Sequence, residues 1–216
     1  MLNFSKKSRV LVVAPHADDE VHCGGTIKKF SKMGCEIAYV SFSFCAASLP
    51  GGFSEEDIKE ENSKSLDILG VEDELRFNFD FNVRHFDAYR QDILEELVLL
   101  RNRFQPTVVL CPSMDDSHQD HVVVHNECER AFRRNVTLLG YMHPLNSRAI
   151  FPNFFAMLKH DEWIAKLESW NAYESQRHKP TPFTCTWLDT VCKMWGSLGF
   201  GVGNHAEAFH ALRCCT

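Results

Sequence analysis

Residues 10–25, VLVVAPHADDEVHCGG, lead from an apolar run directly into one histidine and three acidic side chains. A continuous apolar run such as residues 10–13 is typical of a strand that is covered on both faces. Helix-type sequence follows as far as Gly34, so we expect a strand, a charged turn and a helix. Four ionisable groups at a buried strand end are costly to desolvate unless they pair or bind a cation.

Strand-like and helix-like segments alternate along the rest of the chain. We expect strands at residues 9–15, 35–44, 75–81, 107–113, 137–142, 154–160 and 205–213. We expect helices at residues 19–34, 54–70, 87–106, 118–134 and 161–177. This alternation predicts an α/β fold, a Rossmann-like three-layer sandwich with a mostly parallel central sheet. Residues 179–204, rich in Pro, Gly and aromatic residues, are expected to be irregular and to form a lid or a satellite region.

The composition narrows the class of protein. The 216 residues, 44% of them hydrophobic, suit one domain spanning residues 1–216. A net charge of −6 argues against nucleic-acid binding. No apolar run approaches the roughly 20 residues that span a bilayer, and no secretory signal is expected. Nine cysteines without a CxxC pair favour reduced thiols, so we expect a cytoplasmic location. The sequence leaves the oligomeric state open, and a homo-oligomer is compatible with it.

A second charged stretch, CPSMDDSHQDH at residues 111–121, follows another buried strand. It offers Asp115, Asp116, His118, Asp120 and His121. In an open parallel sheet, ligands bind at the carboxyl ends of the strands where the strand order reverses. If residues 9–15 and 107–113 are the neighbouring strands at that reversal, the two charged loops meet in one crevice.

Together the two loops hold enough groups for one metal ion and an acid–base apparatus. Catalytic zinc usually takes three His or carboxylate ligands and leaves one position for water. His118 lies three residues before His121 and can reach the same side of a helix. Asp120 can hold one of these imidazoles in a fixed tautomer. Adjacent Asp18 and Asp19 cannot easily point the same way, which favours one as ligand and the other as the base facing the water.

The same two stretches resemble those of a known family. PHADDEVHCGGT (residues 15–26) resembles the PHPDDE…GGT motif of the PIG-L/LmbE-like N-acetylglucosaminyl deacetylases, and HQDH (residues 118–121) matches their HxDH motif. Looser similarity extends over LDILGV, KLESWNAYESQ and the terminal AEAF, and therefore over most of the chain. Ala17 replaces the usual proline, which leaves the loop without the fixed φ of that ring.

The resemblance implies the site and the reaction. It implies three zinc ligands, which are His16, Asp19 and His121. It makes Asp18 the general base and places His118, in its protonated form, at the oxyanion, with Asp120 orienting it. The implied reaction is hydrolysis of an N-acetyl amide of an N-acetylglucosamine-type sugar or conjugate. The resemblance implies zinc as the metal, yet a site of two histidines and one aspartate also accepts other divalent ions such as Fe²⁺.

Four further residues are candidates for support of the site or for contact with the substrate. These are Glu20, Asp116, His143 and Glu207. For Glu20, a capping or supporting role is favoured over metal ligation, because it stands in the first turn of the expected helix. His143 precedes a proline, and a plain turn is favoured there over contact with the substrate.

Two other functions remain open from the sequence. Clusters of Asp and His also hold pairs of metal ions in phosphoesterases, although a second full ligand set is missing here. A non-catalytic sugar- or metal-binding module is the other alternative. The presence of a base candidate, Asp18, argues against that module.

Overall fold

The computed structural model describes residues 4–149, 151–180 and 183–215. A seven-stranded sheet with the order β3-β2-β1-β4-β5-β7-β6 runs through its centre. The strands are β1 (Arg9–His16), β2 (Glu36–Ser43), β3 (Arg76–Asn78), β4 (Val108–Pro112), β5 (Thr137–Tyr141), β6 (Phe154–Leu158) and β7 (His205–Arg213). β1 to β5 pair in parallel, whereas β7 runs antiparallel to both β5 and β6. The expected α/β fold with a mostly parallel sheet is confirmed.

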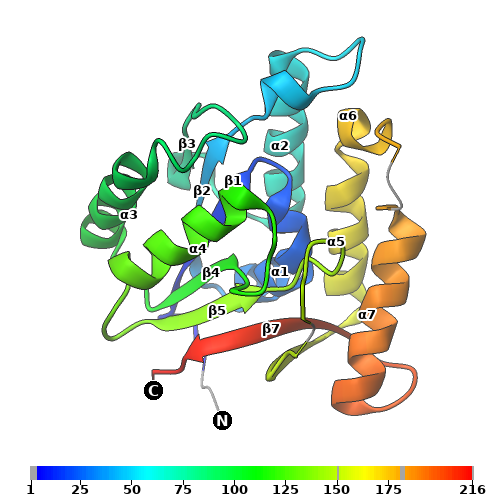
Figure 1. Cartoon of the computed structure of the whole chain (residues 1–216). Coiled ribbons are helices and arrows are strands. Elements are labelled where there is room, and N and C mark those ends of the chain that lie inside the picture. Colours follow the sequence, from blue (N-terminus) through cyan, green and yellow to red (C-terminus); the bar gives the residue numbers. More distant parts are fainter. Residues whose placement is uncertain (1–3, 150, 181–182, 216) are drawn as a thin grey trace.

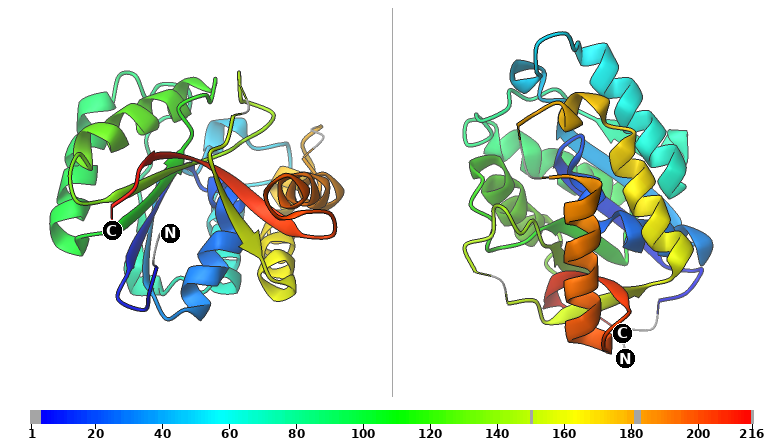
Figure 2. Two further views of the ribbon diagram at one scale, coloured as in Figure 1. Left: turned by 90° about the horizontal axis from the view of Figure 1, so that it is seen from below. Right: turned by 90° about the vertical axis from the view of Figure 1, so that its right-hand side faces the viewer.

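Helices cover both faces of this sheet (Figures 1 and 2). They are α1 (Gly24–Lys32), α2 (Glu55–Leu69), α3 (Arg90–Phe104), α4 (Gln119–Ala131), α5 (His160–Asn171), α6 (Glu174–Arg177) and α7 (Cys185–Phe200), with short 3₁₀ turns η1 (Asp19–Cys23), η2 (Ala46–Ser48) and η3 (Asp73–Leu75). α3 and α4 share one hydrophobic core with the sheet, and α1 and α2 share the core on the opposite face. α5 packs on α1 and α2, so this second face is two helices deep. No helix among the described residues is long and apolar enough to cross a bilayer.

β1 and β4 are the central neighbours at which the direction of winding reverses. From β1 the chain proceeds to β2 and β3 on one side, and from β4 it proceeds to β5 on the other. The carboxyl ends of β1 and β4 therefore flank the crevice where this class of sheet binds ligands. The two charged loops, roughly a hundred residues apart in sequence, leave the sheet side by side, as the sequence predicts (Figure 1).

The expectation of irregular chain over residues 179–204 is wrong for most of that segment. Residues 185–200 form α7, which packs against β7 and α5 (Figure 2). Thr184 caps this helix, because its hydroxyl accepts a hydrogen bond from the Trp187 N–H. Gly196 weakens the sequence signal for a helix, yet it is required there, since a Cβ would come within 1.9 Å of the Asn204 carbonyl oxygen. Residues 181 and 182 lie outside the described part of the segment.

Candidate metal centre

His16 is the last residue of β1, and the chain turns immediately after it. The His16 N–H donates to Asp19 Oδ2 at 2.8 Å, so the Asp19 carboxylate folds back over the strand end. The following N–H, of Ala17, donates to the Ser43 carbonyl at the end of β2. These bonds make a tight turn in which the His16 and Asp19 side chains lie side by side in a largely buried pocket.

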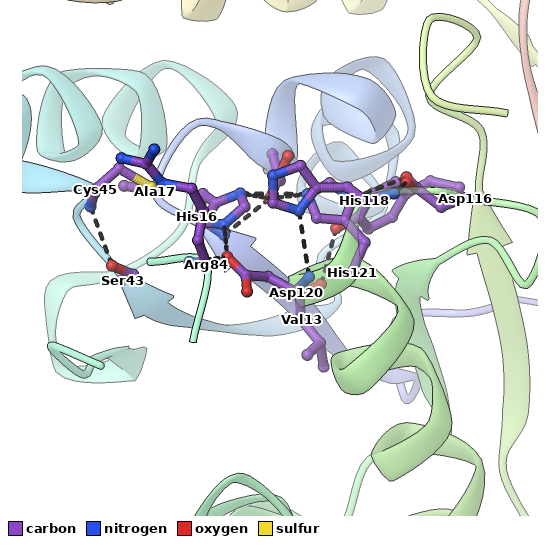
Figure 3. Close-up of polar contacts among 12 residues, drawn as sticks. Val13, His16, Ala17, Ser43, Cys45, Arg84, Asp116, His118, Asp120 and His121 are labelled. Atoms are coloured by element: carbon purple, nitrogen blue, oxygen red, sulfur yellow. Dashed lines mark hydrogen bonds and ion pairs between the residues drawn. The ribbon is translucent and has the colours of Figure 1, made fainter. Parts of the chain in front are cut away.

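The second loop delivers two histidines at the start of α4. Asp116 accepts a hydrogen bond from the His118 N–H at 2.8 Å, which fixes the approach of the chain to the helix. His118 is the N-cap residue of α4, and its Nδ1 accepts from the Asp120 N–H at 3.3 Å. His121 stands in the first turn of the helix and points back over the end of β1 (Figure 3).

Three donor atoms from the two loops form a compact triangle. His16 Nδ1 lies 3.3 Å from Asp19 Oδ2, His121 Nε2 lies 3.2 Å from the same oxygen, and the two ring nitrogens are 3.2 Å apart. A tetrahedral zinc ion with bonds of 2.0–2.1 Å needs ligand atoms about 3.3 Å apart. The donor set therefore fits a small divalent ion.

His118 belongs to a wider grouping. Nitrogen atoms of His16, His118 and His121 all lie within 4.8 Å of one another. The spacing is looser than in the triangle that includes Asp19, and the Nδ1 of His118 is already engaged by Asp120. We therefore take Asp19 rather than His118 as the third ligand candidate.

Two carboxylates hold the histidines from outside the triangle. Asp116 Oδ2 lies 2.8 Å from His121 Nδ1, and Asp120 Oδ2 lies 3.0 Å from His16 Nε2. Each ring thus keeps one nitrogen against a carboxylate and turns the other toward the triangle, which is how carboxylates orient metal-binding imidazoles. Asp116 thus contacts a ligand candidate from outside the triangle, and its supporting role stays a prediction.

Asp120 differs from the expectation that its carboxylate orients His118. The carboxylate contacts His16 instead, and it also accepts the backbone N–H groups of Arg84 at 2.7 Å and Phe86 at 3.4 Å. Only the backbone N–H of Asp120 reaches His118. The reason is geometric: residue 120 lies in the first turn of α4, where its side chain faces β1 and the 82–86 loop.

Charge within the cluster decides the protonation of its histidines. Burial alone would lower the pKa of His121, but the neighbouring Asp19 and Asp116 carboxylates outweigh it and raise that pKa to about 10. A metal ion that binds His121 Nε2 must therefore displace a proton from that nitrogen. Burial, together with the neighbouring His121 and His16, lowers the pKa of His118 to about 4. A protonated His118 is therefore not supported. Because its Nδ1 is an acceptor, the neutral ring carries its proton on Nε2 and can donate from there.

Asp18 faces a cavity next to the triangle. The cavity has a volume of about 180 Å³, and Asp18 and Asp19 line it together with His143, Trp170 and Phe183, among others. Burial raises the pKa of Asp18, the Asp19 charge raises it further, and Lys179 lowers it. Asp19 thus lies toward the histidines and Asp18 toward the cavity, and their roles as ligand and base stay predictions.

Glu20 and His143 support the site or its cavity and take no part in the triangle. Glu20 is fully buried; its Oε1 accepts a hydrogen bond from Ser65 and lies 2.7 Å from the Tyr173 hydroxyl oxygen. Burial raises the pKa of Glu20 to about 8. His143 lies close to His22, with ring centroids 4.0 Å apart and the two rings tilted by 37°, and it lines the cavity beside Asp18.

Glu207 lies behind the site and forms a structural ion pair. Its two carboxylate oxygens accept the N–H groups of Gly25 and Thr26, and it pairs with Lys166 at 2.6 Å. The Lys166 ammonium donates to the carbonyls of Val21 and His22. The pair thus satisfies the backbone groups left open where η1 gives way to α1. Glu207 supports the segment that carries Asp19, and we assign it no contact with substrate.

Four residues that hold the site in place cannot be recognised from the sequence. Arg84 contributes its backbone N–H, which donates a hydrogen bond to Asp120. Its φ of 72° lies in the left-handed region. Tyr39, Asn62 and Tyr173 surround the carbonyl oxygen of Ala17. None of these four residues stands in a charged motif, so local sequence gives no signal for them. The KLESWNAYESQ segment, noted for its similarity to the family, contains Tyr173, and Asn62 lies shortly before LDILGV.

The fold and the site together define a class: a doubly wound α/β domain with a buried His/Asp cluster, able to hold a divalent ion, at the switch point of its sheet. The sequence profile of the PIG-L family, described as GlcNAc-PI de-N-acetylase, matches residues 11–132 of the chain. This match covers more than half of the chain and includes both charged loops. The chain belongs to the PIG-L family of de-N-acetylases.

The chain is similar in sequence or structure to several known proteins, three of which follow. The uncharacterized deacetylase YaiS of Escherichia coli (strain K12) is 26% identical over 177 residues, which are 79% of this chain and 93% of that protein. The N,N'-diacetylchitobiose deacetylase from Pyrococcus horikoshii superposes with a TM-score of 0.75 at 21% identity, covering 95% of this chain and 84% of that one. GalB, the 4-carboxy-2-hydroxymuconate hydratase from Pseudomonas putida KT2440, superposes with a TM-score of 0.77 at 21% identity, covering 97% and 98%. The last two likenesses concern the fold alone.

Proposed function

We propose that this chain is a divalent-metal-dependent N-deacetylase that hydrolyses the N-acetyl amide of an acetylated amino sugar or its conjugate. The observation that carries the proposal is the triangle of His16, Asp19 and His121 donor atoms, which opens beside the cavity lined by Asp18. Membership of the PIG-L family and the deacetylase relatives support the reaction class. The chitobiose deacetylase of the same fold supports a sugar substrate.

The metal would be held by His16 Nδ1, Asp19 Oδ2 and His121 Nε2. Nitrogen and carboxylate donors in this ratio suit zinc, and Fe²⁺ is an acceptable substitute. When bound there, the ion supplies Lewis acidity, which polarises a carbonyl oxygen and lowers the pKa of water. Asp116 and Asp120 keep the two rings aimed at it.

The protein's own groups then manage the protons. Asp18 accepts a proton from the attacking water as the new C–O bond forms at the amide carbon. The same carboxyl group returns that proton to the amide nitrogen as the C–N bond breaks, releasing acetate and a free amine. The Nε2–H of neutral His118 donates to the oxygen that gains negative charge in the tetrahedral state.

The cavity beside Asp18 gives the substrate a mixed surface. Trp170 and Phe183 supply apolar walls, and Gln176 and Lys179 supply polar groups. Small-molecule sites combine apolar walls with a few placed polar groups in this way. A sugar ring, apolar on its faces and polar on its rim, matches such a lining.

The test is amine release by the zinc-loaded chain from N-acetylglucosamine and N,N'-diacetylchitobiose, compared with Asp18→Asn. We expect wild-type turnover, and a fall in kcat of about 10²–10⁴-fold in the variant, the usual contribution of a general base. Metal content should stay near one ion per chain in both proteins. Asp115→Asn, in the second charged loop but outside the triangle, is the matched control and should retain activity.

Other outcomes separate the alternatives. Two metal ions per chain with release of phosphate from a phosphoester would replace the proposal with a phosphoesterase. One ion per chain with sugar binding and no amine release would indicate a binding module. Because GalB shows that this fold also serves a hydratase, the assay must detect the free amine rather than loss of substrate alone.

A further inference from the structure

We propose that Tyr39, Asn62 and Tyr173 are positioning residues that fix the Ala17–Asp18 peptide group and thereby set the geometry of the metal loop. The part of this inference that concerns Asp18 rests on the proposed function. The part that concerns His16 and Asp19 requires only that the triangle binds a metal ion.

Three buried donors converge on the carbonyl oxygen of Ala17. The Tyr39 hydroxyl donates at 3.0 Å, the Asn62 side-chain amide at 2.7 Å and the Tyr173 hydroxyl at 2.6 Å. One partner would satisfy a buried carbonyl, and its oxygen has only two lone pairs. Three donors on one oxygen exceed what simple satisfaction of the backbone requires.

The donors come from distant parts of the chain. Tyr39 lies on β2, Asn62 on α2, and Tyr173 directly before α6, at separations of 22, 45 and 156 residues from Ala17. The three side chains are buried, with exposed fractions of 0%, 2% and 0%. The Asn62 nitrogen also lies within 3.1 Å of both hydroxyl oxygens. The three side chains therefore form one connected network, which is stiffer than three separate bonds.

The other end of Ala17 is held as well. Its N–H donates to the Ser43 carbonyl at 3.0 Å. Because a peptide unit is planar, fixing the Ala17 carbonyl also fixes the direction in which the chain enters Asp18. His16 precedes this unit and Asp19 follows it, so both ligand candidates and the base candidate depend on its orientation.

The strand upstream provides a matched control for the chemistry. The hydroxyl of buried Tyr141 donates to the carbonyl of Val13 at 3.1 Å. This bond is the same in kind, a buried tyrosine on a carbonyl of β1, but it lies in the middle of the strand and not in the metal loop. Loss of the Tyr141 hydroxyl should therefore cost stability without disturbing the loop.

The experiment compares Tyr39→Phe, Tyr173→Phe and Asn62→Ala with Tyr141→Phe. Zinc affinity is measured by chelator competition, kcat and KM by amine release at saturating zinc, and stability by thermal melting of the metal-free chain. We expect zinc affinity about 10-fold weaker or more in the three network variants, within the 10–100-fold range of supporting residues around metals. We also expect a lower kcat with an unchanged KM. Tyr39→Phe is the cleaner of the two tyrosine variants, because the Tyr173 hydroxyl also lies 2.7 Å from Glu20 Oε1.

Tyr141→Phe should lower the melting temperature and leave zinc affinity and kcat within about twofold. Network variants that behave like Tyr141→Phe, with a lower melting temperature and unchanged zinc affinity, would overturn the inference and leave these residues a structural role only. If Asn62→Ala fails to fold, the two Tyr→Phe variants, which keep the aromatic ring, still test the positioning role. If the wild-type chain binds zinc but releases no amine, the proposed function fails, while the comparison of zinc affinities still tests the positioning role.

Discussion

The carboxylate of Asp120 lies 3.0 Å from Nε2 of His16, a residue 104 positions earlier in the chain. This contact joins the two charged loops independently of any metal ion. It also decides which nitrogen of His16 is free, because the ring donates from Nε2 to the carboxylate and leaves Nδ1 toward the triangle. The backbone N–H groups of Arg84 and Phe86 hold the carboxylate in turn. The centre is therefore assembled from three segments of the chain.

Asp120→Asn should weaken metal binding while leaving the fold in place. The amide keeps the shape of the carboxylate but removes the charge that fixes His16, and such changes cost about 10–100-fold in metal affinity. Chelator competition measures the effect, with Asp115→Asn as the control from the same loop. Unchanged metal affinity combined with lost activity would instead place Asp120 in the chemistry itself.

His118→Ala and His121→Ala should separate catalysis from metal binding. His121 supplies a corner of the triangle, so its removal should leave little metal on the chain. His118 donates from outside the triangle, so its removal should retain one ion and lower kcat by about 10²–10³-fold, as for loss of an oxyanion donor. Metal analysis and initial rates on the two variants, purified together, give the answer. Loss of metal in His118→Ala would make that residue the third ligand in place of Asp19.

The fold was predictable because its signals are local and repeated. Apolar runs such as residues 108–110 predict buried strands. A glycine predicts the end of a helix, and Gly70 ends α2 in the left-handed conformation. The sequence of α7 does not predict a helix, and the reason is again local. Its glycines, the preceding Pro180 and Pro182, and its aromatic residues obscure the helical pattern. Only its packing against β7 explains why Gly196 is needed there.

The charged part of the site was predictable for a different reason. Ionisable groups at strand ends need partners, so His16, Asp19 and His121 can be recognised in the sequence as candidate site residues. Uncharged side chains that support the site carry no such signal in the sequence. Asn62 and Tyr173 contact the loop only after the chain has folded, and no periodicity distinguishes them from other buried polar residues. The partner of Asp120 could not be predicted either, since it depends on how α4 meets the end of β1.

Glu207→Gln should destabilise the chain strongly. The substitution leaves the Lys166 ammonium buried without its counter-charge, and breaking a buried pair in this way costs about 3–5 kcal/mol. Glu60→Gln is the control, because the exposed pair of Glu60 with Lys64 should contribute about 0.3–0.5 kcal/mol. Urea unfolding of the wild type, Glu207→Gln and Glu60→Gln measures the difference in free energy of unfolding. Equal stability of the two variants would mean that Lys166 is satisfied by the Val21 and His22 carbonyls alone.

Gly196→Ala tests how α7 docks on the sheet. In an exposed helix the change from glycine to alanine stabilises by about 1 kcal/mol. Here the added Cβ would meet the backbone of Asn204 and His205, at 1.9 Å and 2.8 Å, so α7 must shift away from β7. We expect a net loss of about 1–3 kcal/mol, the usual cost of overpacking. Ser197→Ala, the next residue on the exposed side of the same helix, should be neutral or slightly stabilising. A gain in stability for Gly196→Ala in thermal melts would show that α7 does not pack closely against the start of β7.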